Sequence, residues 1–271
     1  MIDAVAVKLT GLFVYPVKGA RGISLREADV DARGLAHDRR FMVVDAAGTY
    51  VTQRGAPRLA LLETAIEGGH LRLRALGDDA RVPLSPQGAR RRVVVWDDTC
   101  EAVDCGDDAA RIVSGLVGSP SRVVHMPDDV VRPVDPAYAA PGDRVGFADG
   151  FPLLVTTEAS LAELNARLER PVPMDRFRPN VVLDGEGPFD EDLYATLRVG
   201  TLHMRMPKRC ARCVVTTVDQ ATAEVSKEPL RTLATFRTAD RGVYFGQNAI
   251  PDAPGVLRVG DGATFGARVT E

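Results

Sequence analysis

Short runs of β-branched and aromatic residues, separated by Gly, Asp and Pro, restrict the fold of this chain more than any other feature. The first third carries four of them, LTGLFVYPV, RRFMVVDAAGTYVTQR, HLRLRAL and RRVVVWD. Such runs between turn residues are typical of strands, and DAAGTY predicts a hairpin turn between Val44 and Val51. The sequence after FRPNVVL is again strand-like, and alternating βαβ units are missing. A Rossmann sheet is therefore disfavoured.

Two segments interrupt the strand pattern and are expected to form helices. GDDAARIVSGLVG offers Asp107 or Asp108 as the N-cap and Gly118 as the stop. TTEASLAELNARLER offers Thr156 or Thr157 as the N-cap, followed by leucines at helical spacing. The sequence thus predicts an α+β, mainly β protein with two β-rich, barrel-like domains and a few packed helices.

A long stretch rich in Pro, Asp and Gly, SPSRVVHMPDDVVRPVDPAYAAPGDRVGFADG, follows the first expected helix. Apolar residues recur through it, so it is not a flexible linker. We take it as the domain junction and expect one domain over residues 1–120 and a second over residues 121–271.

Composition excludes two classes of partner. The chain has 271 residues, and its formal net charge of −3 gives no bulk positive field for nucleic acid. Its longest apolar runs, such as FPLLV, are too short to span a bilayer, so no membrane partner is expected. The N-terminus lacks a basic leader followed by a long apolar run, and a cytoplasmic location is expected.

The stretch KRCARCVVTTV is the strongest candidate for chemistry. Cys210 and Cys213 lie three apart among Lys and Arg, and nearby cations favour the nucleophilic, metal-binding thiolate. In a regular strand the two would face opposite sides, which favours one working cysteine. A four-cysteine zinc site with Cys100 and Cys105, a redox pair, and two inert structural thiols remain open alternatives.

Other basic residues accompany glycines or strand ends. Lys18 lies in YPVKGARG, Arg40 in HDRRFMVV, and Arg178 and Asn180 in RFRPNVVL. Glycines permit close approach of an anionic group, so these residues either line an anion pocket together or are separate surface charges. His37 and His125 fit no Cys-His pattern and are expected to be surface or core histidines. Nucleotide-binding and zinc-protease signatures are absent from the sequence.

Read together, these motifs resemble a known family. The segment from YPVKGARG through VTQR to PRLALL is similar to the MOSC N-terminal β-barrel domain. FADGFPLLVTTEASLAELNARL, RFRPNVVL, CARCVVTTVD and FGQN resemble the MOSC domain. Their order resembles the subfamily of the mitochondrial amidoxime-reducing component and its bacterial relatives. The resemblance covers nearly the whole chain.

The resemblance implies a molybdenum cofactor, a molybdopterin that carries molybdenum and a phosphate. It makes Cys213 the metal ligand and a catalytic residue. Asp149 is a separate candidate for the proton donor. The implied cofactor-binding residues are Lys18, Gly19, Arg40, Asp149, Gly150, Arg178, Asn180, Ala211, Arg212, Cys213 and Asn248. The implied reaction is two-electron reduction of an N-hydroxylated small molecule, N–OH to N–H, with release of water.

This sequence departs from the family pattern at three positions. Gly19 and Ala211 stand where amidoxime-reducing members have serine, and Asn248 stands where animal members have tyrosine. Cys100 and Cys105 alone cannot build an iron–sulfur cluster that needs four cysteine ligands. Electrons are therefore expected from a separate redox protein or reductase. A cofactor carrier or sulfur-transfer protein without turnover is the alternative function.

Overall fold

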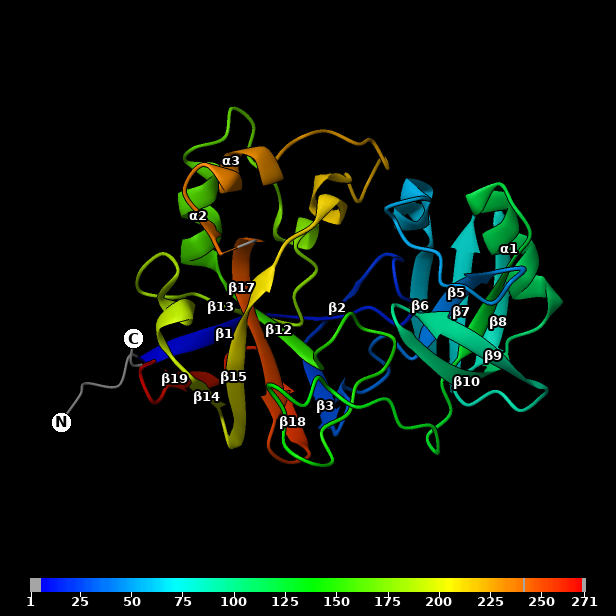
Figure 1. Cartoon of the computed structure of the whole chain (residues 1–271), viewed down its shortest axis with the longest axis horizontal. Coiled ribbons are helices and arrows are strands. Elements are labelled where there is room, and N and C mark those ends of the chain that lie inside the picture. Colours follow the sequence, from blue (N-terminus) through cyan, green and yellow to red (C-terminus); the bar gives the residue numbers. More distant parts are fainter. Residues whose placement is uncertain (1–5, 241, 270–271) are drawn as a thin grey trace.

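The computed structural model describes residues 6–240 and 242–269 of the chain. Strands dominate it, and the helices are short and few (Figure 1). This confirms the predicted mainly β, α+β class with two β-rich parts. Neighbouring strands are almost all antiparallel, as expected for a fold without Rossmann topology. None of the helices in the described residues has the length and apolar run needed to cross a bilayer.

One part is a closed barrel, which we call the barrel lobe. Its strands follow the order β12-β13-β1-β19-β14-β15-β17, and β17 pairs back with β12. Closure lets the inward side chains form one core, which includes Leu12, Val155, Met204 and Phe265. The barrel strands are β1 (Ala6–Val14), β12 (Leu153–Thr157), β13 (Val181–Leu183), β14 (Thr196–Val199), β15 (Leu202–Ala211), β17 (Gly242–Pro251) and β19 (Gly262–Phe265). β2 (Ile23–Leu25) and β16 (Thr238–Ala239) pair at its margins.

The other part, the first lobe, combines two small sheets with a helix and lies on the right in Figure 1. β5 is buried on both faces: Phe41 and Val43 enter one core, and Met42 and Val44 enter another. One sheet contains β5 (Phe41–Asp45), β11 (Ser121–His125), β10 (Asp98–Asp104) and β9 (Arg90–Val95). The other contains β6 (Glu63–Glu67), β7 (His70–Ala75) and β8 (Asp78–Pro83).

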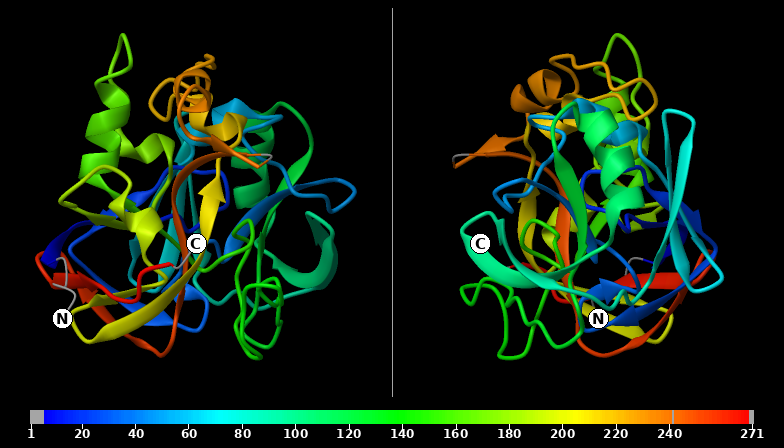
Figure 2. Two further views of the ribbon diagram at one scale, coloured as in Figure 1. Left: turned by 60° about the vertical axis from the view of Figure 1, so that its left-hand side comes forward. Right: turned by 90° about the vertical axis from the view of Figure 1, so that its right-hand side faces the viewer.

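Helix α1 (Asp107–Val117) packs on the first lobe against β7, β8 and β11, facing the viewer in the right panel of Figure 2. Gly118, at φ 82°, ends it as predicted, but its N-cap is Gly106 rather than Asp107 or Asp108. Helix α2 (Glu158–Asn165) begins as predicted, because Thr157 accepts a hydrogen bond from the Ser160 N–H. The remaining helical turns are α3 (Leu230–Ala234), η1 (Pro57–Leu61), η2 (Met174–Arg176), η3 (Asp190–Leu193) and η4 (Val214–Thr217).

The chain crosses between the lobes more than once. β1 comes first but belongs to the barrel, whereas β11 lies beyond residue 120 but pairs with β5 and β10 of the first lobe. A small sheet of β18 (Gly255–Arg258), β3 (Glu27–Asp31) and β4 (Gly34–Leu35) adds a further link. Residues 126–152 then lead from β11 back to β12. Each lobe therefore contains segments from both sides of residue 120, and the domain boundary placed there stays a prediction.

Candidate functional site

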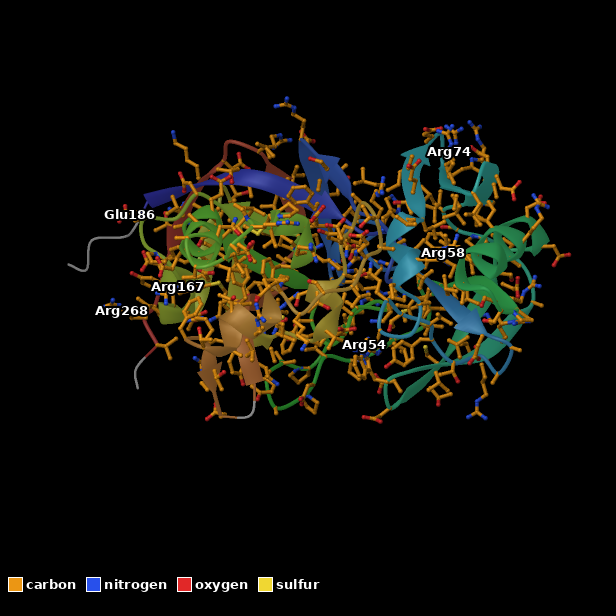
Figure 3. The ribbon with its side chains drawn as sticks, turned by 90° about the horizontal axis from the view of Figure 1, so that it is seen from above. Arg54, Arg58, Arg74, Arg167, Glu186 and Arg268 are labelled. Atoms are coloured by element: carbon orange, nitrogen blue, oxygen red, sulfur yellow. The ribbon has the colours of Figure 1, made fainter. Side chains whose placement is uncertain are left out.

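A cavity of about 440 Å³ is lined by residues of both lobes. The first lobe contributes the segment from Thr52 to Arg54, and Arg54 is seen where the two lobes meet in Figure 3. The barrel lobe contributes the end of β15 and part of β17. Basic side chains predominate over acidic ones in the lining: Lys18, Arg39, Arg54, Arg178, Lys208, Arg209 and Arg212, against Asp135 and Asp149. The cavity therefore suits an anionic ligand.

Nearly all of the residues expected at the site line this cavity, although they come from five separate stretches of sequence. They are Lys18, Gly19, Asp149, Gly150, Arg178, Asn180, Ala211, Arg212, Cys213 and Asn248. The anion-pocket interpretation of the scattered cations is thus favoured over separate surface charges.

Arg40 is the exception and corrects the sequence expectation. Its Nη2 donates to both carboxylate oxygens of Asp31, at 2.8 and 2.6 Å, and its side chain does not line the cavity. The neighbouring Arg39 lines it instead. The physical reason is that both residues lie in the turn before β5, where Asp31 holds the Arg40 side chain away from the cavity. Arg39 also has a left-handed backbone, at φ 45°.

Lys18 and Asp149 form an ion pair on the cavity wall. Desolvation acts to raise the pKa of Asp149, but the charge and hydrogen bond of Lys18, together with Arg54 and Trp96, hold that pKa well below its usual range. Burial lowers the pKa of Lys18, and Asp149 offsets this only in part. Asp149 is consequently an ionised acceptor at neutral pH.

Arg39 and Arg178 both pack on the Tyr15 ring, each with its guanidinium carbon 4.3 Å from the ring centroid. Arg39 Nη1 also donates to Asn180 Oδ1 at 3.0 Å. Arg178 is 8% exposed, and its Nη2 has no hydrogen-bond partner among the described residues. Burial, reinforced by repulsion from Arg39, lowers the pKa of Arg178 to about 10. A buried cation with a free donor is stabilised by an anion.

The two cysteines of CARC lie where β15 ends. The expectation that VVTTV is a strand is wrong: β15 stops at Ala211, and Val214–Thr217 is the 3-10 turn η4. The parity argument for opposite faces therefore fails, and Cys210 and Cys213 both line the cavity. Each Sγ accepts from a different guanidinium, Cys210 from Arg212 Nη1 at 2.9 Å and Cys213 from Arg54 Nη2 at 3.2 Å.

Two residues of the first lobe that the sequence did not single out, Arg54 and Trp96, contact Cys213 and Asp149. Arg54 stacks on Trp96, with its guanidinium carbon 4.5 Å from the ring centroid. The Trp96 Nε1–H donates to Asp149 Oδ1 at 3.2 Å, and the ring packs against Tyr50. Trp96 occupies the turn between β9 and β10 at φ 54°, a strained backbone for a bulky residue. Its place as the chain's single tryptophan was the signal available from the sequence.

The structure does not support the zinc alternative. Cys100 and Cys105 lie on and just after β10 and pack with first-lobe core residues, whereas Cys210 and Cys213 line the cavity. In residues 6–240 and 242–269, no group of three or more His, Cys, Asp or Glu side chains is placed to hold a metal ion. Burial raises the pKa of the Cys105 thiol, as expected for a structural thiol.

His125 and Glu191 are buried titratable groups outside the cavity. His125 is 6% exposed and packs against Phe41 with the two rings tilted, and burial lowers its pKa to about 4, so it is the core histidine considered from the sequence. Glu191 is fully buried and accepts hydrogen bonds from Ser160 and Thr157 at the start of α2. Burial raises the pKa of Glu191 to about 7.

Comparison with known proteins agrees with this architecture. The family model described as the MOSC N-terminal beta barrel domain matches residues 6–120, and the MOSC domain model matches residues 142–264. Mitochondrial amidoxime-reducing component 1 of Homo sapiens is 36% identical over 92% of this chain and 80% of its own length. Component 1 of Mus musculus is also 36% identical, over 92% and 79%. Component 2 of Homo sapiens is 32% identical, over 92% and 81%. The chain therefore belongs to the MOSC family that includes the mitochondrial amidoxime-reducing components.

Proposed function

We propose that this protein is a molybdenum-cofactor-dependent reductase of N-hydroxylated compounds, with electrons supplied by a separate redox protein or reductase. The family relatives are named for amidoxime reduction, which supports this substrate class. The observation that carries the proposal is the buried, unpartnered Nη2 of Arg178 in the cavity that also contains the Cys213 thiol. A cationic recess beside a soft sulfur ligand fits a cofactor with a phosphate and a thiolate-binding metal.

Each end of the cofactor has matching residues in this cavity. Lys18, Arg39 and Arg178 would hold the phosphate by charge-assisted hydrogen bonds, and Gly19 would let the backbone approach. Gly19 has a φ of 82°, so a side chain here is disfavoured by backbone strain. Cys213 would be the protein ligand of molybdenum. When bound, the cofactor would supply the two-electron redox chemistry that these side chains lack.

Asp149 acquires a more definite role than the sequence allowed. Because Lys18 keeps it ionised, Asp149 is an acceptor at neutral pH rather than a proton donor. Its Oδ1 takes the bonds from Lys18 and Trp96, so Oδ2 is oriented by the same contacts. We assign Asp149 to hold an N–H or O–H group of the substrate. Reduction of R–NHOH to R–NH₂ and water consumes two protons and two electrons. Asp149 does not supply these protons.

Metal and pterin analysis of protein purified from a cofactor-producing host is the direct test. We expect molybdenum and pterin, with little zinc, and reduction of benzamidoxime driven by reduced methyl viologen. NADH alone should give no turnover, because the donor is proposed to be a separate protein. Molybdenum-loaded protein that releases cofactor readily and never turns over would favour the carrier alternative. Zinc in place of molybdenum would refute both proposals.

Arg178→Gln tests the phosphate contact directly. Loss of a hydrogen bond to a charged group costs about 1.5–3 kcal/mol, so pterin occupancy should fall roughly 10- to 100-fold when cofactor is limiting. Arg170→Gln, at an exposed position, is the matched control. Equal occupancy in both variants would remove Arg178 from the cofactor site. The cytoplasmic location remains a prediction.

A further inference from the structure

Two buried glutamines, one from each lobe, form a closed amide pair behind the cavity cations. Gln53 Nε2 donates to Gln220 Oε1 at 3.0 Å, and Gln220 Nε2 donates to Gln53 Oε1 at 3.0 Å. Gln53 follows the first hairpin of the first lobe, and Gln220 lies in the loop after η4. Their exposed fractions are only 1% and 6%. The pair therefore joins the two lobes by reciprocal hydrogen bonds away from solvent.

All amide hydrogens of the pair are used, which fixes the orientation of both side chains. The second N–H of Gln53 Nε2 donates to the Gly19 carbonyl at 2.7 Å. The second N–H of Gln220 Nε2 donates to the Val218 carbonyl at 3.0 Å. Rotating one of the two amides by 180° would place the two carbonyl oxygens against each other and the two N–H groups against each other. Gln220 must therefore present its oxygen, and not its nitrogen, to Gln53 Nε2.

That oxygen has a second partner. Gln220 Oε1 also accepts from Arg178 Nη1, at 3.3 Å. The contact holds one edge of the guanidinium and leaves Nη2, the unpartnered donor, available. On the other side of the pair, Gln53 steadies the Gly19 carbonyl next to Lys18. One pair thus contacts two of the three cavity segments to which a phosphate role was assigned above, Lys18–Gly19 and Arg178.

We propose that Gln53 and Gln220 are positioning residues that aim Arg178 Nη2 and the Lys18–Gly19 backbone at a phosphate oxygen. The inference rests on the proposed cofactor function and adds the residues that preset its anion site. The neutral amide is important, because it orients a guanidinium without cancelling its charge. A carboxylate at the same place would pair with Arg178 and compete with the phosphate.

Gln220→Glu and Gln220→Met separate these contributions, since both are close in size to glutamine. The readout is the rise in unfolding temperature of cofactor-free protein on adding inorganic phosphate, compared with chloride at equal ionic strength. Gln220→Met removes the acceptor and should weaken phosphate binding by about tenfold, the effect of a hydrogen bond to a charged group. Gln220→Glu should weaken it more, because it adds a competing charge. The exposed Gln87→Glu should leave it unchanged.

The outcomes are distinguishable because stability and phosphate response are measured on the same sample. Variants that unfold at lower temperature but keep the wild-type phosphate response would show a purely structural pair and overturn the inference. Gln53→Met, on the opposite side of the pair, provides the same comparison if a Gln220 variant fails to fold. Arg178→Gln serves as the reference. If it loses the response while the glutamine variants keep it, the positioning role is wrong and the anion site stands. If wild-type protein gives no phosphate response, both the pair and the anion site are refuted.

Discussion

Arg54 Nη2 lies 3.2 Å from Cys213 Sγ, so a guanidinium of the first lobe contacts the thiol of the barrel lobe. The contact joins residues 159 positions apart and places a cation beside the proposed metal ligand. Hydrogen bonds to a ligating sulfur orient it and tune the metal. The thiol site is therefore completed only when the two lobes pack together.

Arg54→Gln should retain the fold and lose metal-site function. Outer-shell partners of metal ligands typically contribute 10- to 100-fold, and we expect a loss of about that size in molybdenum retention or in viologen-driven turnover. Arg58→Gln, another exposed arginine of the same lobe, is the control. Similar molybdenum content and turnover in the two variants would contradict a role for the Arg54–Cys213 contact.

Cys213→Ser and Cys210→Ser should differ sharply, although both thiols line the cavity. The first replaces the proposed metal ligand by a hard, poorly ionised hydroxyl and should abolish reductase activity. The second replaces only the sulfur that accepts from Arg212, by a hydroxyl that can still accept, and should keep most of the activity. Pterin content, measured in parallel, should persist in both because the phosphate contacts remain. Equal loss of activity from the two changes would refute Cys213 as the single ligand.

Glu191 should make folding stability fall as pH rises. Its folded pKa of about 7 lies above the ordinary value, so its protonated form stabilises the fold below about pH 4.5, and this contribution is lost as pH rises through 7. A shift of this size corresponds to about 3 kcal/mol. Urea unfolding at pH 5 and pH 8 should show a smaller decrease for Glu191→Gln than for wild type. The exposed Glu186→Gln should behave as wild type, and a parallel decrease in Glu191→Gln would disprove the assignment.

His125 should have the opposite effect on folding stability, which should fall as pH decreases over part of the pH range in which Glu191 acts. Its folded pKa of about 4 lies below the ordinary 6.5, so folding must hold the ring neutral as pH falls from 6.5 toward 4. The resulting loss reaches about 3 kcal/mol and then levels off. His125→Phe should remove that loss, as measured by unfolding at pH 7 and pH 4.5. The exposed His203→Gln is the control, and an unchanged acid loss in His125→Phe would refute the explanation.

Local patterns predicted the elements that depend on neighbouring residues. Thr157 and Gly118 bound α2 and α1 because capping and left-handed backbone are properties of single positions. The N-cap of α1 was mispredicted, since Gly106 rather than an aspartate occupies it. At Arg39 and Arg40, sequence alone could not decide which of two adjacent arginines faces the cavity. Asp31, the partner that holds Arg40 away, lies on a different strand.

The site residues that the sequence did not reveal were missed for a different reason. Gln53, Arg54 and Trp96 carry no motif, and their partners Gln220, Cys213 and Asp149 are distant in sequence. These residues make their contacts only when the two lobes pack together, and no local sequence pattern predicts that packing. The resemblance to a known family identified most of the residues that line the cavity, but it did not identify the contacts made by Gln53, Arg54 and Trp96.

The pairing of β1 with β19 also has a consequence for how the protein is made. Ala6 lies opposite Thr264, so strands from near the two ends of this sequence are neighbours in the barrel. A nascent chain cannot complete this barrel until β19 has emerged from the ribosome, long after the residues that bear Lys18 and Arg39. The thiol, the cations and the glutamine pair are assembled together only then. Any cofactor that the complete cavity holds would therefore enter only after β19 has been made.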